Sequence, residues 1–125
     1  MKLHAGSVAA LAVTNISAHS LSIAQTPYAQ SIQVGQGIGV QLWEVSNIGS
    51  MSEADIARWV ALKPELVILG TGTKHQFLNP KLAVQLVRSG VGIECMTTAA
   101  AARTYNVLLE EGRNVLGAFV IEQQH

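Results

Sequence analysis

The sequence has little charge and a single cysteine. Asp, Glu, Lys and Arg make up 13% of its 125 residues, about half the fraction usual in globular domains. Eight basic residues balance eight acidic ones, so no net charge attracts nucleic acid, and we expect no nucleic-acid partner. Cys95 alone permits no disulfide and gives no metal-ligand spacing, and with scattered histidines it predicts no metal site.

Long apolar runs are also missing. No stretch approaches the roughly 20 apolar residues of a membrane-spanning helix, so the chain is not expected to cross a membrane. The apolar run from Val8 to Val13 is too short and too weakly flanked for a signal peptide, and no Arg-rich leader is present. We therefore expect a cytoplasmic protein, or a mitochondrial one if the chain is eukaryotic.

Hydrophobic residues are abundant, at 49% of the chain. With so little charge to solvate the outside, we expect some apolar surface to be covered by a protein partner or by a second copy of the chain. The length fits a single domain spanning residues 1–125.

The first half contains short stretches of alternating apolar residues. They predict antiparallel strands at Leu21 to Ile23, Ile32 to Val34 and Val40 to Leu42. Turn signals lie between them at Thr26 to Tyr28 and at Gly35 to Gly39. A meander is the simplest assembly of these strands.

The second half begins with a predicted helix and a buried strand. Ser52 followed by Asp55 forms a capping box, and Pro64 prevents the helix from continuing. The compact apolar run from Leu66 to Leu69 then predicts a central strand that ends in a tight glycine-containing loop.

Two further helices are well marked at their ends. One is capped by Asn79 and closed by Gly90, and the other starts at Thr97 or Thr98 and runs through Glu111. Strands follow them at Val91 to Met96 and Val115 to Ile121. Strand, helix and strand within about thirty residues predict a parallel βαβ unit, and hence an α/β fold.

The two parallel strands place their exit loops at one edge of the sheet, where α/β folds usually bind ligands. The turn of Gly70, Thr71 and Gly72 could direct backbone N–H groups at an anion. It does not complete a dinucleotide fingerprint, because His75 stands at the third glycine position, and it lacks the end of a phosphate loop. A tight strand exit is the favoured interpretation, and no cofactor is predicted.

A polar stripe on the last predicted helix is the second candidate. Arg103, Asn106 and Glu110 share one helix face. A solvated row is the alternative, but asparagine is a mediocre helix former, so Asn106 is expected to make a specific hydrogen bond, either to a ligand or to a neighbouring loop.

No set of residues predicts catalysis. The imidazole of His75 could act as a base, but no nucleophile is visible beside it. Threonines near the strand exits are interpreted as caps, and Cys95 as a buried inert thiol. Trp43 and Trp59 either fill a core or anchor a partner. An enzyme is therefore the less favoured hypothesis.

Several motifs between Pro64 and Val120 resemble one family. They are LGTG at residues 69–72, the pair Met96 and Thr98, RTYN at 103–106 and EGR at 111–113, with a looser match through MKLHA at the start and the turn around Tyr28. The family is the group of domains of unknown function that includes the mitochondrial complex I assembly factor 3 and an adipogenesis-associated domain protein.

The resemblance implies a three-layer fold with a central mixed, mostly parallel sheet, extra antiparallel strands on one side, and a last strand antiparallel to its neighbours. It implies no known reaction, and its best-described role is to help assemble complex I through protein contacts. Thr97, Ala99 and Ala102 stand where many members have an acidic residue, a glycine and a cysteine. Any role that needs that thiol is absent here.

Two hypotheses follow. The first is a non-catalytic interaction or assembly protein; the alternative is a small-anion or small-ligand domain, which could be an enzyme, with a crevice at the carboxyl edge. An enclosed polar pocket lined by Arg103, Asn106 and His75 would favour the second, and a flat apolar patch the first. The candidate ligand-binding or partner-binding residues are Gly70, Thr71, Gly72, His75, Met96, Thr98, Arg103, Asn106, Glu110 and Arg113.

Overall fold

The computed structural model describes residues 5–123. Its helices are α1 (Ala5–Leu11), α2 (Glu53–Leu62), α3 (Pro80–Arg88) and α4 (Thr98–Glu110), with a 3-10 turn at Ile48–Ser50. Its strands are β1 (Val13–Ile16), β2 (Leu21–Ile23), β3 (Thr26–Tyr28), β4 (Ile32–Gly35), β5 (Gly39–Leu42), β6 (Leu66–Gly70), β7 (Gly92–Met96) and β8 (Val115–Phe119). The α/β class predicted from the sequence is confirmed.

Helices of the second half begin at the predicted caps. The Asp55 carboxylate accepts the backbone N–H of Ser52 at 2.9 Å, and α2 starts directly after Ser52. The side-chain oxygen of Asn79 accepts from the first turn of α3 at 3.0 Å, and the hydroxyl of Thr97 accepts from that of α4 at 3.3 Å. Gly90 follows α3 with φ +80°, the left-handed conformation expected after a helix end.

The central sheet has the strand order β5-β4-β8-β6-β7. β6 pairs in parallel with both β7 and β8, which confirms the predicted βαβ unit. β4 runs antiparallel to β8 and to β5. The expectation that the last strand is antiparallel to its neighbours is therefore wrong for one side, because β8 is parallel to β6 and antiparallel only to β4.

The predicted meander is divided between two sheets. β4 and β5 form a hairpin that extends the central sheet, whereas β2 pairs with β1 and β3 in a separate three-stranded antiparallel sheet. The turn predicted at Thr26 to Tyr28 is in fact strand β3. The chain instead reverses direction just before β3, at Ala24 and Gln25, which both have positive φ. Neither residue is a usual signal for such a turn.

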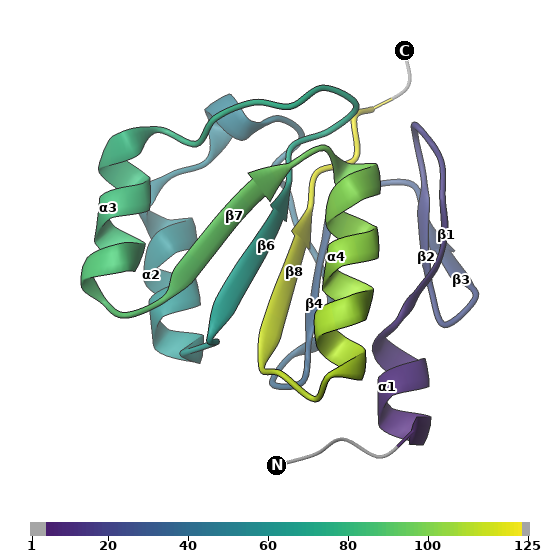
Figure 1. Cartoon of the computed structure of the whole chain (residues 1–125). Coiled ribbons are helices and arrows are strands. Elements are labelled where there is room, and N and C mark those ends of the chain that lie inside the picture. Colours follow the sequence, from purple (N-terminus) through teal and green to yellow (C-terminus); the bar gives the residue numbers. More distant parts are fainter. Residues whose placement is uncertain (1–4, 124–125) are drawn as a thin grey trace.

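Three layers result, as Figure 1 shows. α2 and α3 cover one face of the central sheet, and α4 with the N-terminal three-stranded sheet covers the other. Each face has its own hydrophobic core. The core beneath α4 includes Tyr105 and Phe119, whose rings meet edge to face at 5.5 Å.

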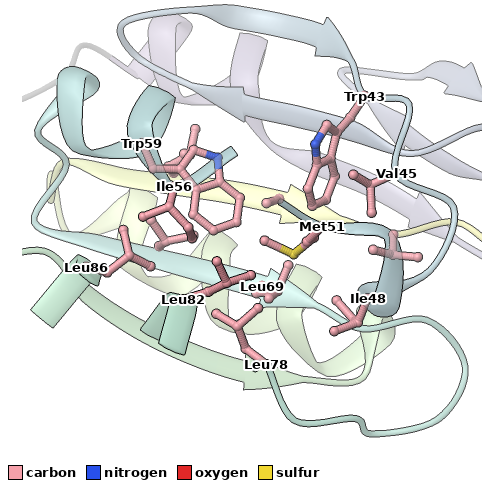
Figure 2. Close-up of a cluster of buried hydrophobic side chains, with 14 of the residues drawn as sticks. Trp43, Val45, Ile48, Met51, Ile56, Trp59, Leu69, Leu78, Leu82 and Leu86 are labelled. Carbon is pink, nitrogen blue, oxygen red and sulfur yellow. The ribbon is translucent and has the colours of Figure 1, made fainter. Parts of the chain in front are cut away.

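Both tryptophans belong to the core beneath α2 and α3 (Figure 2). Trp43 and Trp59 are 4% and 0% exposed, and their rings lie 5.9 Å apart. They therefore fill the core and are not free to anchor a partner.

Between residues 5 and 123, no helix is long and apolar enough to cross a bilayer.

Gly70, at the end of β6, has no room for a side chain. A Cβ at Gly70 would lie 2.8 Å from the backbone Cα of Thr98, closer than real contacts allow. We predict that Gly70→Ala lowers the free energy of unfolding by about 1–3 kcal/mol through overpacking, measured by urea denaturation. Gly37→Ala is the control, because a Cβ there meets nothing within 4 Å. Equal effects of the two substitutions would contradict the prediction.

Candidate functional site

The loops that leave β6 and β7 meet at the carboxyl edge of the sheet, as predicted, and they meet at Thr98. This residue is buried. Its hydroxyl accepts the N–H of Gly72 at 2.9 Å and donates to the carbonyl of Val120 at 2.7 Å. The hydroxyl thus joins the exits of β6 and β8 to the first turn of α4, and both its donor and its acceptor capacity are used.

The anion position predicted beside Gly72 faces a carboxylate of the chain itself. Glu122 accepts the backbone N–H of Thr73 at 2.8 Å and the Thr73 hydroxyl at 3.0 Å. Gly72 has φ +106°, and a Cβ there would collide with the Glu122 carboxylate. Within the predicted turn, however, the N–H of Thr71 donates to Met96 and that of Gly72 to Thr98, so only the N–H of Thr73, outside that turn, contacts the carboxylate.

A small pocket of about 290 Å³ opens beside this carboxylate. Most of its lining is apolar, with Ile16, Val120 and Ile121 among the apolar residues and Thr73 and Thr97 among the polar ones. Arg103, Asn106 and His75 do not line this pocket. The crevice expected at this edge therefore does not include these three residues.

On α4, the polar stripe has a structural role at its centre. The Asn106 side chain accepts the backbone N–H of Val13 at 2.9 Å and donates to the Val13 carbonyl at 2.8 Å. The neighbouring Tyr105 hydroxyl donates to the carbonyl of Leu11 at 2.9 Å. Asn106 thus makes the specific bond expected of it, to the N-terminal sheet, while Arg103 and Glu110 lie exposed.

The loop between β6 and α3 carries His75. The buried hydroxyl of Thr71 fixes this loop by donating to the Lys74 carbonyl at 2.7 Å and accepting the Gln76 N–H at 3.1 Å. His75 is exposed, and its ring meets Phe77 edge to face at 4.7 Å. Phe77 is 85% exposed, so the two rings form an aromatic pair on the surface.

The remaining predicted residues make local contacts. The sulfur of Met96 accepts the Thr104 hydroxyl at 3.4 Å, and exposed Arg113 pairs with Glu65 at 3.0 Å. Cys95 is half-buried and not fully buried as expected; burial still raises the pKa of its thiol, which lowers the thiolate fraction. Burial also raises the pKa of Tyr105.

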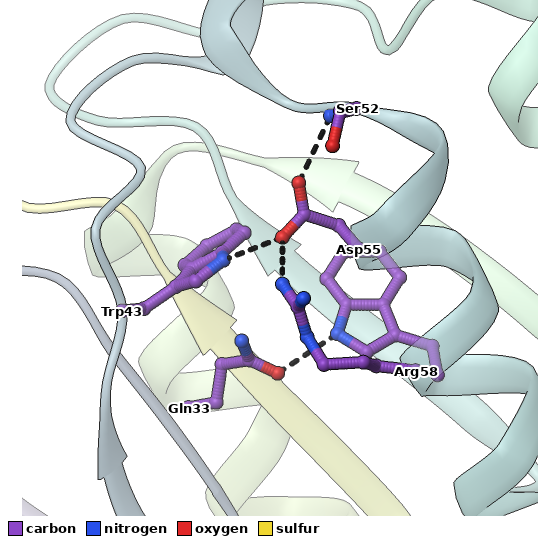
Figure 3. Close-up of polar contacts among 6 residues, drawn as sticks. Gln33, Trp43, Ser52, Asp55 and Arg58 are labelled. Carbon is purple, nitrogen blue, oxygen red and sulfur yellow. Dashed lines mark hydrogen bonds and ion pairs between the residues drawn. The ribbon is translucent and has the colours of Figure 1, made fainter.

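A polar network beside Trp43 and Trp59 was not predicted (Figure 3). The buried Asp55 carboxylate accepts the Trp43 indole N–H at 3.0 Å and also binds the Arg58 guanidinium. The Trp59 indole N–H donates to Gln33 at 2.8 Å. The sequence marked Asp55 only as a helix cap, and nothing local to Gln33 or Trp43 indicated that they would meet α2.

The comparisons with known proteins agree with this fold. The family model described as "Protein of unknown function (DUF498/DUF598)" matches residues 13–120. The chain belongs to this family. One relative has a name that states a role: it is the NADH dehydrogenase [ubiquinone] 1 alpha subcomplex assembly factor 3 of Mus musculus. The two sequences are 33% identical over 81 residues, which make up 63% of this chain and 43% of the mouse protein.

Two other proteins are similar to the chain. The "13 kDa major membrane protein" of Francisella tularensis is 33% identical over 72 residues, which are 58% of each chain. The crystal structure of a Bordetella parapertussis protein is 31% identical, has a TM-score of 0.82, and covers 89% of this chain and 95% of its own. The chain thus spans less than two thirds of the named relatives, but nearly the whole of a solved family structure.

The Asn106 bonds yield a testable prediction. Asn106→Ala removes both contacts with Val13 and should lower the free energy of unfolding by about 1–2 kcal/mol, as measured by urea denaturation. The Val13 amide should also exchange its hydrogen faster. Arg103→Ala, on the exposed face of the same helix, should change stability by less than about 0.5 kcal/mol. Unchanged exchange at Val13 in Asn106→Ala would disprove this role.

Proposed function

We propose that this chain is a non-catalytic binding domain that helps to assemble a larger protein complex, with respiratory complex I as its candidate target. Support comes first from the family, in which the mouse relative is named as an assembly factor of NADH dehydrogenase. It comes also from the strand exits, where the hydroxyls of Thr71 and Thr98 are used in internal hydrogen bonds and serve the fold.

The observation that carries the proposal is a set of exposed apolar side chains on α3 and in the loop before it. Phe77, Val84 and Val87 are 85%, 44% and 65% exposed. Val84 and Val87 are three residues apart, so they share one face of the helix. We call these three residues the α3 stripe, and we interpret it as the surface that a protein partner covers.

The segment that carries the α3 stripe is basic in sequence, although Glu53 of α2 contacts Gln85 of α3 at 3.4 Å. Lys74 and Lys81 precede or start α3, Arg88 ends it, and no acidic residue occurs between residues 66 and 93. Such a surface fits an acidic protein segment with apolar side chains of its own. The chain as a whole is neutral, so this local excess of positive charge would orient the partner on α3.

The alternative, a ligand crevice at the carboxyl edge, stays a prediction with less support. A small anion there would compete with the internal Glu122 carboxylate for the N–H of Thr73. Arg103, one of the residues expected to line such a crevice, does not line the pocket at that edge.

Partner capture tests the proposal. We predict that the tagged chain, expressed in its native cells, recovers complex I subunits or their assembly intermediates, and that the double variant Phe77→Ser, Val87→Ser loses them. Val107→Ser is the control, because Val107 is 54% exposed on α4, away from the α3 stripe. Capture of no reproducible partner, or equal capture by the double variant, would refute the proposal.

Self-association is the second prediction from the low charge. Light scattering at micromolar concentration should detect a dimer or higher oligomer, whereas monomer across that range would rule it out. The same double variant should lose self-association if the α3 stripe mediates it, whereas an oligomer that persists in the variant would place self-association on another surface. The cytoplasmic or mitochondrial location stays a prediction from the sequence.

A further inference from the structure

A pocket of about 560 Å³ opens between the β4–β5 hairpin and α2. It shares no lining residue with the pocket at the carboxyl edge. Gln33 and Gln41 line it from the hairpin, Asp55 and Arg58 from α2, and Glu44 from the segment after β5. We call it the Gln33–Arg58 pocket. Its volume is sufficient for a small polar molecule.

Gln33 presents an unused donor to this pocket. The residue is only 6% exposed, and its oxygen must face Trp59, because an indole N–H can only donate. The amide nitrogen therefore points the other way, towards Trp43 and Arg58 in Figure 3. Among residues 5–123 it has no hydrogen-bond acceptor, and it is not sealed from solvent, since no fully buried side-chain nitrogen lacks a partner.

Arg58 supplies further donors. One of its nitrogens binds Asp55, and the side chain is 58% exposed; its other N–H groups make no hydrogen bond to residues 5–123. Asp55 needs no additional donor, because it already accepts from Trp43 and from the backbone N–H of Ser52. Gln33 and Arg58 thus offer several donors to a single acceptor group, an arrangement that suits a carboxylate.

The charged residues of the pocket limit which charged groups a ligand can have besides a carboxylate. Arg58 and Asp55 neutralise each other, and Glu44 leaves one negative charge in the lining. A ligand with only a carboxylate would be repelled by Glu44, whereas an ammonium group on the same ligand would pair with it. We propose that the Gln33–Arg58 pocket binds a small zwitterion of the α-amino-acid type, with its carboxylate on Gln33 and Arg58 and its ammonium group towards Glu44.

Tryptophan fluorescence gives a direct measurement. Trp43 and Trp59 are the only tryptophans in the chain, and they donate to Asp55 and Gln33, respectively. L-alanine, titrated at constant ionic strength, should change the emission with saturation. Propionate and propylamine each carry one of its two charges and should bind at least about tenfold more weakly. An unsaturated response to alanine, or equal binding of propionate, would overturn the proposal.

Variants assign the response to this pocket. Arg58→Gln removes the exposed cation, and Gln33→Glu keeps an oxygen for Trp59 while it removes the amide donor; each should weaken alanine binding by about tenfold or more. Arg103→Gln, an exposed arginine outside the pocket, is the matched control and should bind as the wild type does. Two independent variants keep the test valid if one of them fails to fold, as checked by circular dichroism. An unchanged affinity in the folded variants would overturn the proposal, which is independent of the assembly role.

Discussion

The Thr98 hydroxyl links the chain segments that leave the central sheet at its carboxyl edge. It accepts from Gly72 and donates to Val120, so one buried oxygen links segments 22 and 26 residues away. Around it, the backbone N–H of Thr71 donates to Met96 at 2.8 Å and that of Val120 to Gly70 at 2.9 Å. Each of these buried groups would be costly without its partner. The edge therefore uses its polar atoms to fix three exits in place, and this explains why Gly70 has no space for a side chain.

Local signals predicted the second half of the fold well, because helix ends and a buried strand are encoded within a few residues. Asn79 and Gly90 delimit α3 where the sequence places them. The first half was predicted less well, since its strands are three or four residues long and their pairing depends on distant partners. The Ala24–Gln25 turn carries no usual turn residue, and β1 is held by Asn106, 93 positions away, so neither was visible from local sequence.

In the candidate site too, features set by local sequence could be predicted, and contacts between distant residues could not. The sequence correctly indicated that the loops after β6 and β7 would meet, because strand direction alone requires it. It also indicated that Asn106 makes a specific bond, because asparagine is unfavourable within a helix. It could not indicate that Glu122 lies against Thr73, 49 residues away, or that Gln33 meets Trp59 across 26 residues. Such contacts arise from tertiary packing, and a single sequence has no pattern that records them.

The two polar regions of the molecule differ in how completely their donors are used. At the carboxyl edge, Thr98 has both an internal donor and an internal acceptor, so its conformation needs no ligand. In the Gln33–Arg58 pocket, only the oxygen of the Gln33 amide has a hydrogen-bond partner within the fold. Its oxygen accepts the N–H of the buried Trp59 indole, which needs an acceptor. The amide nitrogen, on a strand whose residues are all buried, has no acceptor among residues 5–123 and lies beside the partly exposed Arg58 side chain, and this is the donor that the proposed ligand would use.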